Sequence, residues 1–322
     1  MEMPSANAWN GEGEAPEAMR PYLAPGAAAV ARRYPVVVDD YWLARCEGEN
    51  GAPFRAQAFP DPRELDAPLP GDSDDPFAEL ADASPLPGVV RRFRDRILVV
   101  ATDVCAMRCR HCTRKNLLGK HAVPAWEEYP KIAGYIRDNP EIREVLLSGG
   151  DPMTLGGAEL AKRVEVFAAL EQIYAIRIGT RVPCSDPCRV TPTLAEALGR
   201  SRKVWVNTQF NHPAEITPEA ARACGLLVDA GIPVSCQTVL LKGVNNDPDT
   251  LEALFRSLQA IRVRPYYAFA GDPVAGTGHF RVTPAEAAAL EREVAERIGG
   301  LAMPRFVADI PGAKRKTPVS VF

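Results

Sequence analysis

Three cysteines lie close together in the stretch DVCAMRCRHCTRK, which spans residues 103–115. They are Cys105, Cys109 and Cys112, separated first by three residues and then by two. A closed structural zinc site uses four ligands, and a disulfide uses two cysteines, so neither arrangement needs three thiols on one loop. A cubane iron–sulfur cluster has four irons, and three thiolates leave the fourth iron open to another ligand. The spacing therefore predicts that these three cysteines hold a [4Fe–4S] cluster.

Other interpretations of the cysteines stay open from the residues alone. The triplet is also compatible with a zinc site completed elsewhere or with three incidental buried thiols. Cys184 and Cys188, in PCSDPC, fit either a second metal site or two packed thiols. The cysteines outside the triplet that offer a fourth ligand are Cys46, Cys184, Cys188, Cys224 and Cys236.

Composition excludes several classes of protein. The 322 residues carry a formal net charge of −3, which argues against a nucleic-acid or membrane-surface partner held mainly by charge. No apolar run approaches the roughly 18 residues of a membrane span. The N-terminal stretch is acidic and rich in proline and glycine, unlike a signal peptide. We therefore expect a cytoplasmic protein with reduced thiols.

Strand-like and helix-like segments alternate from about residue 96 onward. Three of the helical segments begin with a Thr-Pro pair, at Thr191, Thr217 and Thr283, which suits an N-cap hydroxyl followed by proline in the first turn. A last run, at 303–310, is expected to add an edge strand. The expected strands are 97–103, 144–150, 175–180, 204–210, 234–241 and 263–269, and the expected helices lie near 126–138, 158–172, 192–200, 217–230, 248–260 and 284–298.

This alternation predicts an α/β fold with a parallel sheet and right-handed crossovers. Six units are fewer than the eight of a complete barrel, so a partial barrel and an open doubly wound sheet both fit the period. The expected organisation is a disordered or extended segment at 1–27, an irregular lead-in at 28–95, the βα domain at 96–300 and a C-terminal segment at 301–322.

Residues able to do chemistry follow the ends of these strands. The cysteine loop follows the first strand, Ser148-Gly149-Gly150-Asp151 ends the second, and Arg181 follows the third. His212 follows the fourth strand and Asp272 the sixth. Because α/β folds place their active sites at the carboxyl ends of parallel strands, we expect one site there.

The motifs taken together resemble a known family. CxxxCxxC after the first strand and a Gly-Gly motif after the second are similar to the radical S-adenosylmethionine superfamily. Within it, residues 85–320 resemble the lysine 2,3-aminomutase family through CRHCTR, LLSGGDP, RIGTRVP, NTQFNHPAEIT, QTVLLKGVN, VRPYYAF, GHFR and KTPV. The resemblance implies an isomerase with a partial (βα)6 TIM-like barrel, a [4Fe–4S] cluster, S-adenosyl-L-methionine and pyridoxal 5'-phosphate.

The resemblance also implies roles for residues that would bind S-adenosylmethionine. Gly149 and Gly150, which permit close backbone approach, resemble the motif that holds the methionine amino group. Ser148 and Asp151 flank them in that motif. The candidates for the adenosyl side are His111, His212 and Gln237.

Pyridoxal phosphate needs a lysine for covalent attachment and cationic groups for its phosphate. By the resemblance that lysine is Lys316, seven residues after Asp309, with Lys314 as a neighbouring rival. Without the resemblance, the sequence KRK would indicate only a solvated basic tail. The candidate cofactor contacts are Arg181, for the phosphate or the ring, and Arg92 and Arg96, for the phosphate.

The resemblance assigns three charged residues to substrate binding. Arg114 matches the residue that pairs with an amino acid's α-carboxylate, for which a guanidinium is suited. Asp272 and Asp309 match two acids that hold a distal ammonium, and two carboxylates repel unless a cation lies between them. The resemblance thus implies migration of the α-amino group of L-lysine to the β-carbon, giving β-lysine. Arginine, another amino acid or different radical chemistry are the alternatives.

The resemblance further implies an external one-electron donor such as flavodoxin or ferredoxin, and it leaves open whether the chain forms a homo-oligomer. Longer relatives carry a zinc-binding C-terminal extension, whereas this sequence stops at Phe322. Asp247 stands where the barrel's zinc cysteine is expected. We therefore expect no structural zinc of that kind.

Overall fold

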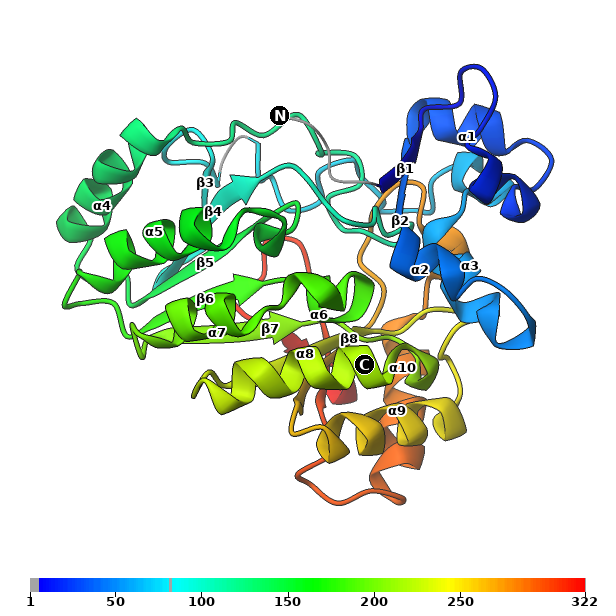
Figure 1. The fold of residues 1–322 in the computed structure, drawn as a ribbon. Coiled ribbons are helices and arrows are strands. Elements are labelled where there is room, and N and C mark those ends of the chain that lie inside the picture. The colour runs from blue at the N-terminus through cyan, green and yellow to red at the C-terminus, as the bar shows by residue number, and fades with distance from the viewer. Residues whose placement is uncertain (1–5, 81–82, 322) are drawn as a thin grey trace.

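The computed structural model describes residues 6–80 and 83–321 (Figure 1). Within them, nine strands form one sheet in the order β11-β10-β9-β8-β7-β6-β5-β4-β3. The strands β4 to β10 run parallel, and the edge strands β3 and β11 are antiparallel to their neighbours. The strands are β3 (Val89–Phe93), β4 (Arg96–Thr102), β5 (Glu144–Gly149), β6 (Ala175–Gly179), β7 (Val204–Thr208), β8 (Val234–Val239), β9 (Arg264–Phe269), β10 (Arg305–Ala308) and β11 (Thr317–Pro318).

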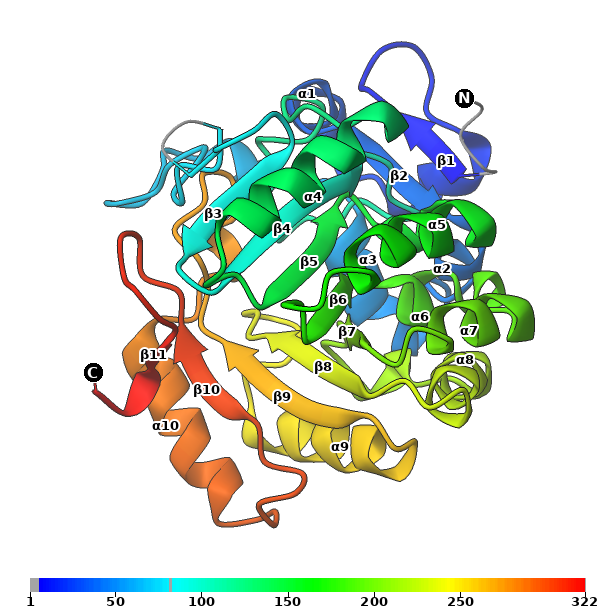
Figure 2. The ribbon, with the colours of Figure 1, turned by 90° about the vertical axis from the view of Figure 1, so that its left-hand side faces the viewer.

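One major helix follows each strand from β4 to β9 and packs on the same outer face of the sheet (Figure 2). This arrangement confirms six βα units. β3 and β11 lie at opposite ends of the sheet and do not pair with each other in the described residues, so the sheet is an open, partial barrel. The helices are α4 (Tyr129–Asp138), α5 (Gly157–Ala168), α7 (Pro192–Gly199), α8 (Pro218–Asp229), α9 (Pro248–Ala260) and α10 (Pro284–Ala295).

Alternation along the strands separates the core from the inner face. Successive side chains of a strand point to opposite faces, so Val145 and Leu147 of β5 are fully buried beneath the helices. Leu146 and Ser148, which alternate with them, face a cavity on the inner side. The same alternation in the neighbouring strands gives the sheet an apolar outer face and a mixed, partly charged inner face.

Side-chain caps fix where the helices start. The hydroxyls of Thr191, Thr217 and Thr283 accept hydrogen bonds from backbone N–H groups three residues on, as their Thr-Pro pairs predict. Asp247 caps α9 by accepting from the backbone N–H of Thr250 at 2.8 Å. The residue that stands at the expected zinc position therefore has a structural use of its own.

Two expectations about the chain's ends are refined by the structure. β10, expected as an edge strand, lies second from the edge, because β11 pairs with it outside. Residues 6–27, expected to be disordered or extended, contain β1 (Ala6–Trp9), which pairs with β2 (Val36–Asp39), and a short 3-10 helix. Residues 1–5 lie outside the described part of the chain. No helix among the described residues is long and apolar enough to cross a membrane.

The lead-in packs on the carboxyl ends of the parallel strands, at the blue end of the ribbon in Figure 1. It contains α1 (Ala27–Arg33), α2 (Asp40–Ala44) and α3 (Ala52–Ala58). Its fully buried carboxylate, Glu64, accepts two hydrogen bonds from Arg110, at 3.0 and 2.6 Å, and one from Lys115 at 2.6 Å. Both cations belong to the cysteine loop, so the lead-in fixes that loop through buried charge.

We expect Glu64→Gln to destabilise the fold by about 3 kcal/mol, because it leaves two buried cations without their counter-ion. Urea unfolding of the purified chain measures the loss. Glu14→Gln is the matched control, since Glu14 pairs with Arg20 on an exposed surface and should cost little. Equal stability of the two variants would contradict the role of Glu64.

Candidate active site

A cavity of about 1090 Å³ lies against the inner face of the sheet and its carboxyl-end loops. It is larger than a typical pocket for one small ligand, so it has room for more than one. Of the seventeen site residues predicted from the sequence, sixteen line it. They are Arg92, Arg96, Cys105, Cys109, His111, Cys112, Arg114, Ser148, Gly149, Gly150, Asp151, Arg181, Gln237, Asp272, Asp309 and Lys316.

The predicted residue that does not line the cavity is His212. Its Nδ1 accepts a hydrogen bond from the backbone N–H of Ala214 at 3.2 Å, capping a 3-10 helix. The sequence places His212 at the end of a strand, but the local turn directs its ring to this cap. Its predicted contact with the adenosyl group therefore has no support from this arrangement.

The three thiols of the cysteine loop meet at one side of the cavity. Burial raises the pKa of Cys105, and the neighbouring thiols Cys112 and Cys109 raise it further. Burial likewise raises the pKa of Cys112 to about 11, with Cys109 adding to the shift. Thiols that influence one another in this way form a compact sulfur donor set, and iron would stabilise their deprotonated forms.

The three thiols that line the cavity match the number of ligands that a cubane with one open iron needs. In the part of the chain that the structure describes, no group of three or more His, Cys, Asp or Glu side chains is arranged to hold one metal ion. In a cubane each thiolate binds a different iron, so its ligands need not converge on one point. The five other cysteines do not line the cavity, and Cys184 is buried whereas Cys188 is exposed.

The glycines after β5 allow two backbone segments to cross closely. Gly149 has φ of +109°, and a Cβ there would lie 2.4 Å from the carbonyl oxygen of Thr102. A Cβ on Gly150 would lie 2.4 Å from the carbonyl oxygen of Val104. The close approach is therefore to the start of the cysteine loop, which the glycines bring beside the cavity wall.

Asp151 ties the ends of β5 and β6 together. One carboxylate oxygen accepts from Thr180 Oγ1 at 2.6 Å and from the backbone N–H of Met153 at 3.0 Å. The other accepts from the backbone N–H of Arg181 at 2.6 Å. These bonds occupy much of its capacity, so Asp151 shapes this wall of the cavity.

His111 is a buried, neutral base within the cysteine loop. Its Nε2 lies 2.8 Å from the side-chain nitrogen of Gln209 and 3.3 Å from that of Asn211. Two amide donors make Nε2 the acceptor, which places the proton on Nδ1. Burial lowers the pKa of His111 well below its usual value, and the cation of Arg181 lowers it further. Among the described residues Nδ1 has no partner.

Lys316 lies in the cavity against Asp309. Burial lowers the pKa of the lysine, and Asp309 offsets part of that effect. Asp309 also accepts from both ends of the Arg92 guanidinium, at 3.1 and 3.0 Å. Burial alone would raise the pKa of Asp309, but the contacts with Arg92 and Lys316 hold it below its usual value. Arg96, the other predicted phosphate contact, pairs with Asp95 at 2.9 Å.

Asp272 is a cavity acid that has no ion-pair partner among the described residues. One oxygen accepts from Thr113 Oγ1 at 2.8 Å, while Oδ1 is buried with no partner among the described residues. Burial raises its pKa from 3.8 to about 6, and the nearby charge of Asp309 adds to the rise. An unsatisfied buried carboxylate oxygen beside a second carboxylate is suited to a bound cation.

Arg114 is held by an acid that the sequence did not identify as part of the site. Its guanidinium donates to both oxygens of Glu79, at 2.6 and 2.9 Å, and to Ser148 Oγ at 3.4 Å. Glu79 lies in the irregular lead-in, where no local pattern predicts its partner. Thr113, the donor to Asp272, was not identified from the sequence either, although its place beside Cys112 was a signal.

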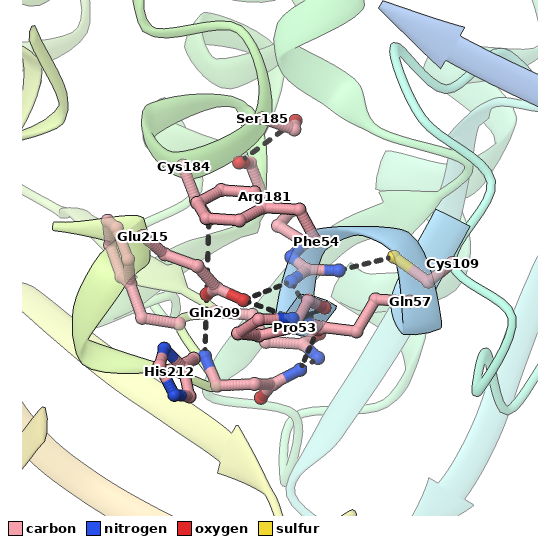
Figure 3. Close-up of polar contacts among 12 residues, drawn as sticks. Pro53, Phe54, Gln57, Cys109, Arg181, Cys184, Ser185, Gln209, His212 and Glu215 are labelled. Atoms are coloured by element: carbon pink, nitrogen blue, oxygen red, sulfur yellow. Dashed lines mark hydrogen bonds and ion pairs between the residues drawn. The ribbon is translucent and has the colours of Figure 1, made fainter. Parts of the chain in front are cut away.

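Arg181, predicted as a pyridoxal phosphate contact, lines the cavity beside the cysteine loop. Its guanidinium contacts Cys109, Gln57 and Glu215, as Figure 3 shows. Gln57 lies on α3 and Glu215 follows β7, so two distant segments orient it. Neither partner was identified from the sequence.

Comparisons with known proteins agree with this geometry. Residues 99–254 match the family model described as the radical SAM superfamily. The L-lysine 2,3-aminomutase of Clostridium subterminale is 39% identical over 297 residues, covering 91% of this chain and 71% of that protein. The glutamate 2,3-aminomutase of Clostridioides difficile is 36% identical, covering 76% and 58%. The crystal structure of Streptococcus suis SuiB bound to S-adenosylmethionine has a TM-score of 0.51 at 12% identity, covering 67% and 50%, and shows the shared fold.

The fold and the cysteine loop thus define a radical S-adenosylmethionine enzyme. The chain belongs to the lysine 2,3-aminomutase family of these enzymes. It is an isomerase whose cofactors are a [4Fe–4S] cluster, S-adenosyl-L-methionine and pyridoxal 5'-phosphate. The sulfur donor set, the buried lysine and the size of the cavity fit this group of cofactors.

The pKa of Asp272 generates a pH prediction. Because the folded-state pKa lies above the usual 3.8, the unfolded chain loses this proton first, and the free energy of unfolding falls as pH rises from about 4 to 6. Asp272→Asn removes that penalty. Its stability relative to the native sequence should therefore improve between pH 4 and pH 7, by on the order of 1–3 kcal/mol.

Urea unfolding at several pH values, without substrate, measures this difference. Asp249→Asn, on the exposed start of α9, is the control and should show no such trend. A stability difference between Asp272→Asn and the native sequence that is flat across this range would contradict the raised pKa.

Proposed function

We propose that this enzyme is an amino-acid 2,3-aminomutase that acts on a basic amino acid, with L-lysine as substrate and β-lysine as product. The observation that carries the proposal is the pair Asp272 and Asp309 at one cavity wall, with an unsatisfied oxygen on Asp272. An ε-ammonium between the two carboxylates would satisfy that oxygen and relieve their repulsion.

The proposed position of the α-carboxylate is Arg114. Its guanidinium can bind a carboxylate with two parallel hydrogen bonds, although Glu79 uses that geometry in the structure. An arriving carboxylate would compete with Glu79 or share the guanidinium through its remaining N–H groups. Glu79 holds Arg114 at the cavity before substrate arrives, and its competition would weaken the affinity of Arg114 for the α-carboxylate.

We assign the cofactors to the surrounding walls. Cys105, Cys109 and Cys112 would hold the cluster, residues 148–151 with His111 and Gln237 would contact S-adenosylmethionine, and Lys316 would attach pyridoxal phosphate. When bound, these groups supply one-electron cleavage of the sulfonium and a carbonyl that can hold a migrating nitrogen. The required electron would come from an external one-electron donor such as flavodoxin or ferredoxin.

Lys316 can reach the neutral form that covalent attachment needs. Burial lowers the pKa of the amine and favours loss of its proton, and the ion pair with Asp309 offsets part of that effect. Arg92 keeps Asp309 oriented toward the lysine. After substrate enters, the same Asp309 would be free to turn to the substrate's distal cation.

Arginine is the second candidate substrate, because a guanidinium can also satisfy two carboxylates. Glutamate is disfavoured on the same grounds, since its side chain would place a third carboxylate beside Asp272 and Asp309. Because the chain is also similar to a glutamate 2,3-aminomutase, a comparison of lysine with glutamate as substrates tests the proposal directly.

We expect the reconstituted enzyme to convert lysine into a β-amino acid under anaerobic conditions, with kcat/KM roughly 100-fold or more above that for glutamate. A like-charge contact of several kcal/mol accounts for this ratio. The kcat/KM for lysine should decrease as the pH drops below about 6, because Asp272 then takes up a proton. Mass spectrometry of products from lysine, arginine and glutamate measures the selectivity, and conversion of glutamate alone would refute it.

Lys316→Ala should abolish the visible absorbance of lysine-bound pyridoxal phosphate, because the attaching amine is gone. Lys314→Ala is the matched control, since it removes a lysine two residues away that does not line the cavity. We expect it to keep the absorbance. The reverse result would assign the cofactor to Lys314, and retention by both variants would leave the enzyme without an assigned lysine.

A further inference from the structure

The guanidinium of Arg181 touches the sulfur of a cysteine in the cluster loop. Nη1 of Arg181 donates a hydrogen bond to Cys109 Sγ at 3.0 Å (Figure 3). The arginine is only 7% exposed and lies over the ring of Trp42, at 4.8 Å from its centroid. A positive charge is thus held beside a thiol that the proposed function makes a cluster ligand.

Other contacts prevent the guanidinium from turning away. Nη2 donates to Gln57 Oε1 at 2.7 Å and to Glu215 Oε1 at 3.2 Å. Gln57 in turn donates to the same oxygen of Glu215 at 2.6 Å, so the three side chains form a closed set. Trp42, Gln57 and Glu215 come from three separate segments, which makes this a built pocket for one arginine.

Both carboxylate oxygens of Glu215 accept hydrogen bonds. Its Oε2 accepts from the backbone N–H of Asn211 at 2.7 Å and from the thiol of Cys184 at 3.4 Å. The carboxylate is buried and does not contact Cys109 directly. It therefore acts on the cysteine only through Arg181 and through its own charge. Cys184 is accounted for as a donor to Glu215.

We propose that Arg181 is a positioning residue that sets the reduction potential of the cluster by donating a hydrogen bond to the sulfur of Cys109. This inference rests on the proposed assignment of Cys109 as a cluster ligand. Hydrogen bonds to ligand sulfurs and nearby charge are among the factors that fix such potentials.

The direction of the effect follows from charge. Reduction adds one electron, supplied by an external one-electron donor, and neither forms nor breaks a bond. The reduced state carries one more negative charge, so a cation with an N–H directed at the sulfur stabilises it more than the oxidised state. Arg181 thus makes reduction easier, while the negative charge of Glu215 partly opposes it.

This arrangement predicts opposite shifts for the two partners. Arg181→Gln should lower the midpoint potential by about 59 mV, which is a tenfold change in the one-electron equilibrium constant. Glu215→Gln should raise it, because it removes the opposing charge while Gln57 still holds the arginine. Arg181→Lys, which keeps the charge but loses the fork of donors, should give an intermediate value.

The experiment is a redox titration of the anaerobically reconstituted chain, followed by electron paramagnetic resonance before S-adenosylmethionine is added. Iron and sulfide content are measured for each variant. Arg163→Gln is the matched control, since it removes a partly buried arginine that pairs with Glu159 on α5, away from the cavity. Its midpoint should equal that of the native sequence.

Each outcome decides a separate question. A fully loaded Arg181→Gln variant with the native midpoint would overturn the inference and leave the proposed function intact. If that variant does not load, unchanged midpoints in both Arg181→Lys and Glu215→Gln overturn the inference in the same way. Failure of the native chain to take up a cluster would instead refute the proposed function.

Discussion

The cysteine loop has no regular secondary structure, so its shape depends on contacts with segments far away in the sequence. The strongest is the buried carboxylate of Glu64, which pairs with Arg110 and Lys115, the residues that flank Cys112 in the loop. Backbone contacts add to it, because the N–H of Arg110 donates to the carbonyl of Gln57. The lead-in is therefore part of the active site, since without it three thiols would have no reason to face one cavity.

Ion pairs also hold charged side chains in the cavity beside this loop. Most charged groups there already have a counter-ion in the structure: Arg114 has Glu79, Arg181 has Glu215, and Lys316 has Asp309. Buried charges need such partners because desolvation penalises an isolated ion. Asp272 has no ion-pair partner among the described residues, and burial together with the nearby charge of Asp309 raises its pKa. A cationic group that binds beside Asp272 would satisfy its unpartnered oxygen.

The open sheet explains how so many groups reach one space. Parallel strands bring their carboxyl ends to one edge, so loops separated by dozens of residues become neighbours. A sheet that does not close leaves its inner face accessible, and alternate side chains such as Ser148 and Gln237 face that space. The helices cover only the outer face, which is why the inner face can remain partly polar. Large cofactors and a substrate can then share one cavity.

The sequence by itself determined the elements and the location of the site. Three features of the sequence are local: the period of the apolar residues, the Thr-Pro pairs and the cysteine spacing. Each of them can be interpreted from the geometry of a single helix, strand or loop. Only the tertiary structure decided which charges meet. The partners of Arg181 and Arg114 come from α3, the β7 loop and the lead-in, and they depend on how irregular segments pack. No local pattern specifies a contact between residues so far apart in the chain, because such a contact arises only when the folded segments come together.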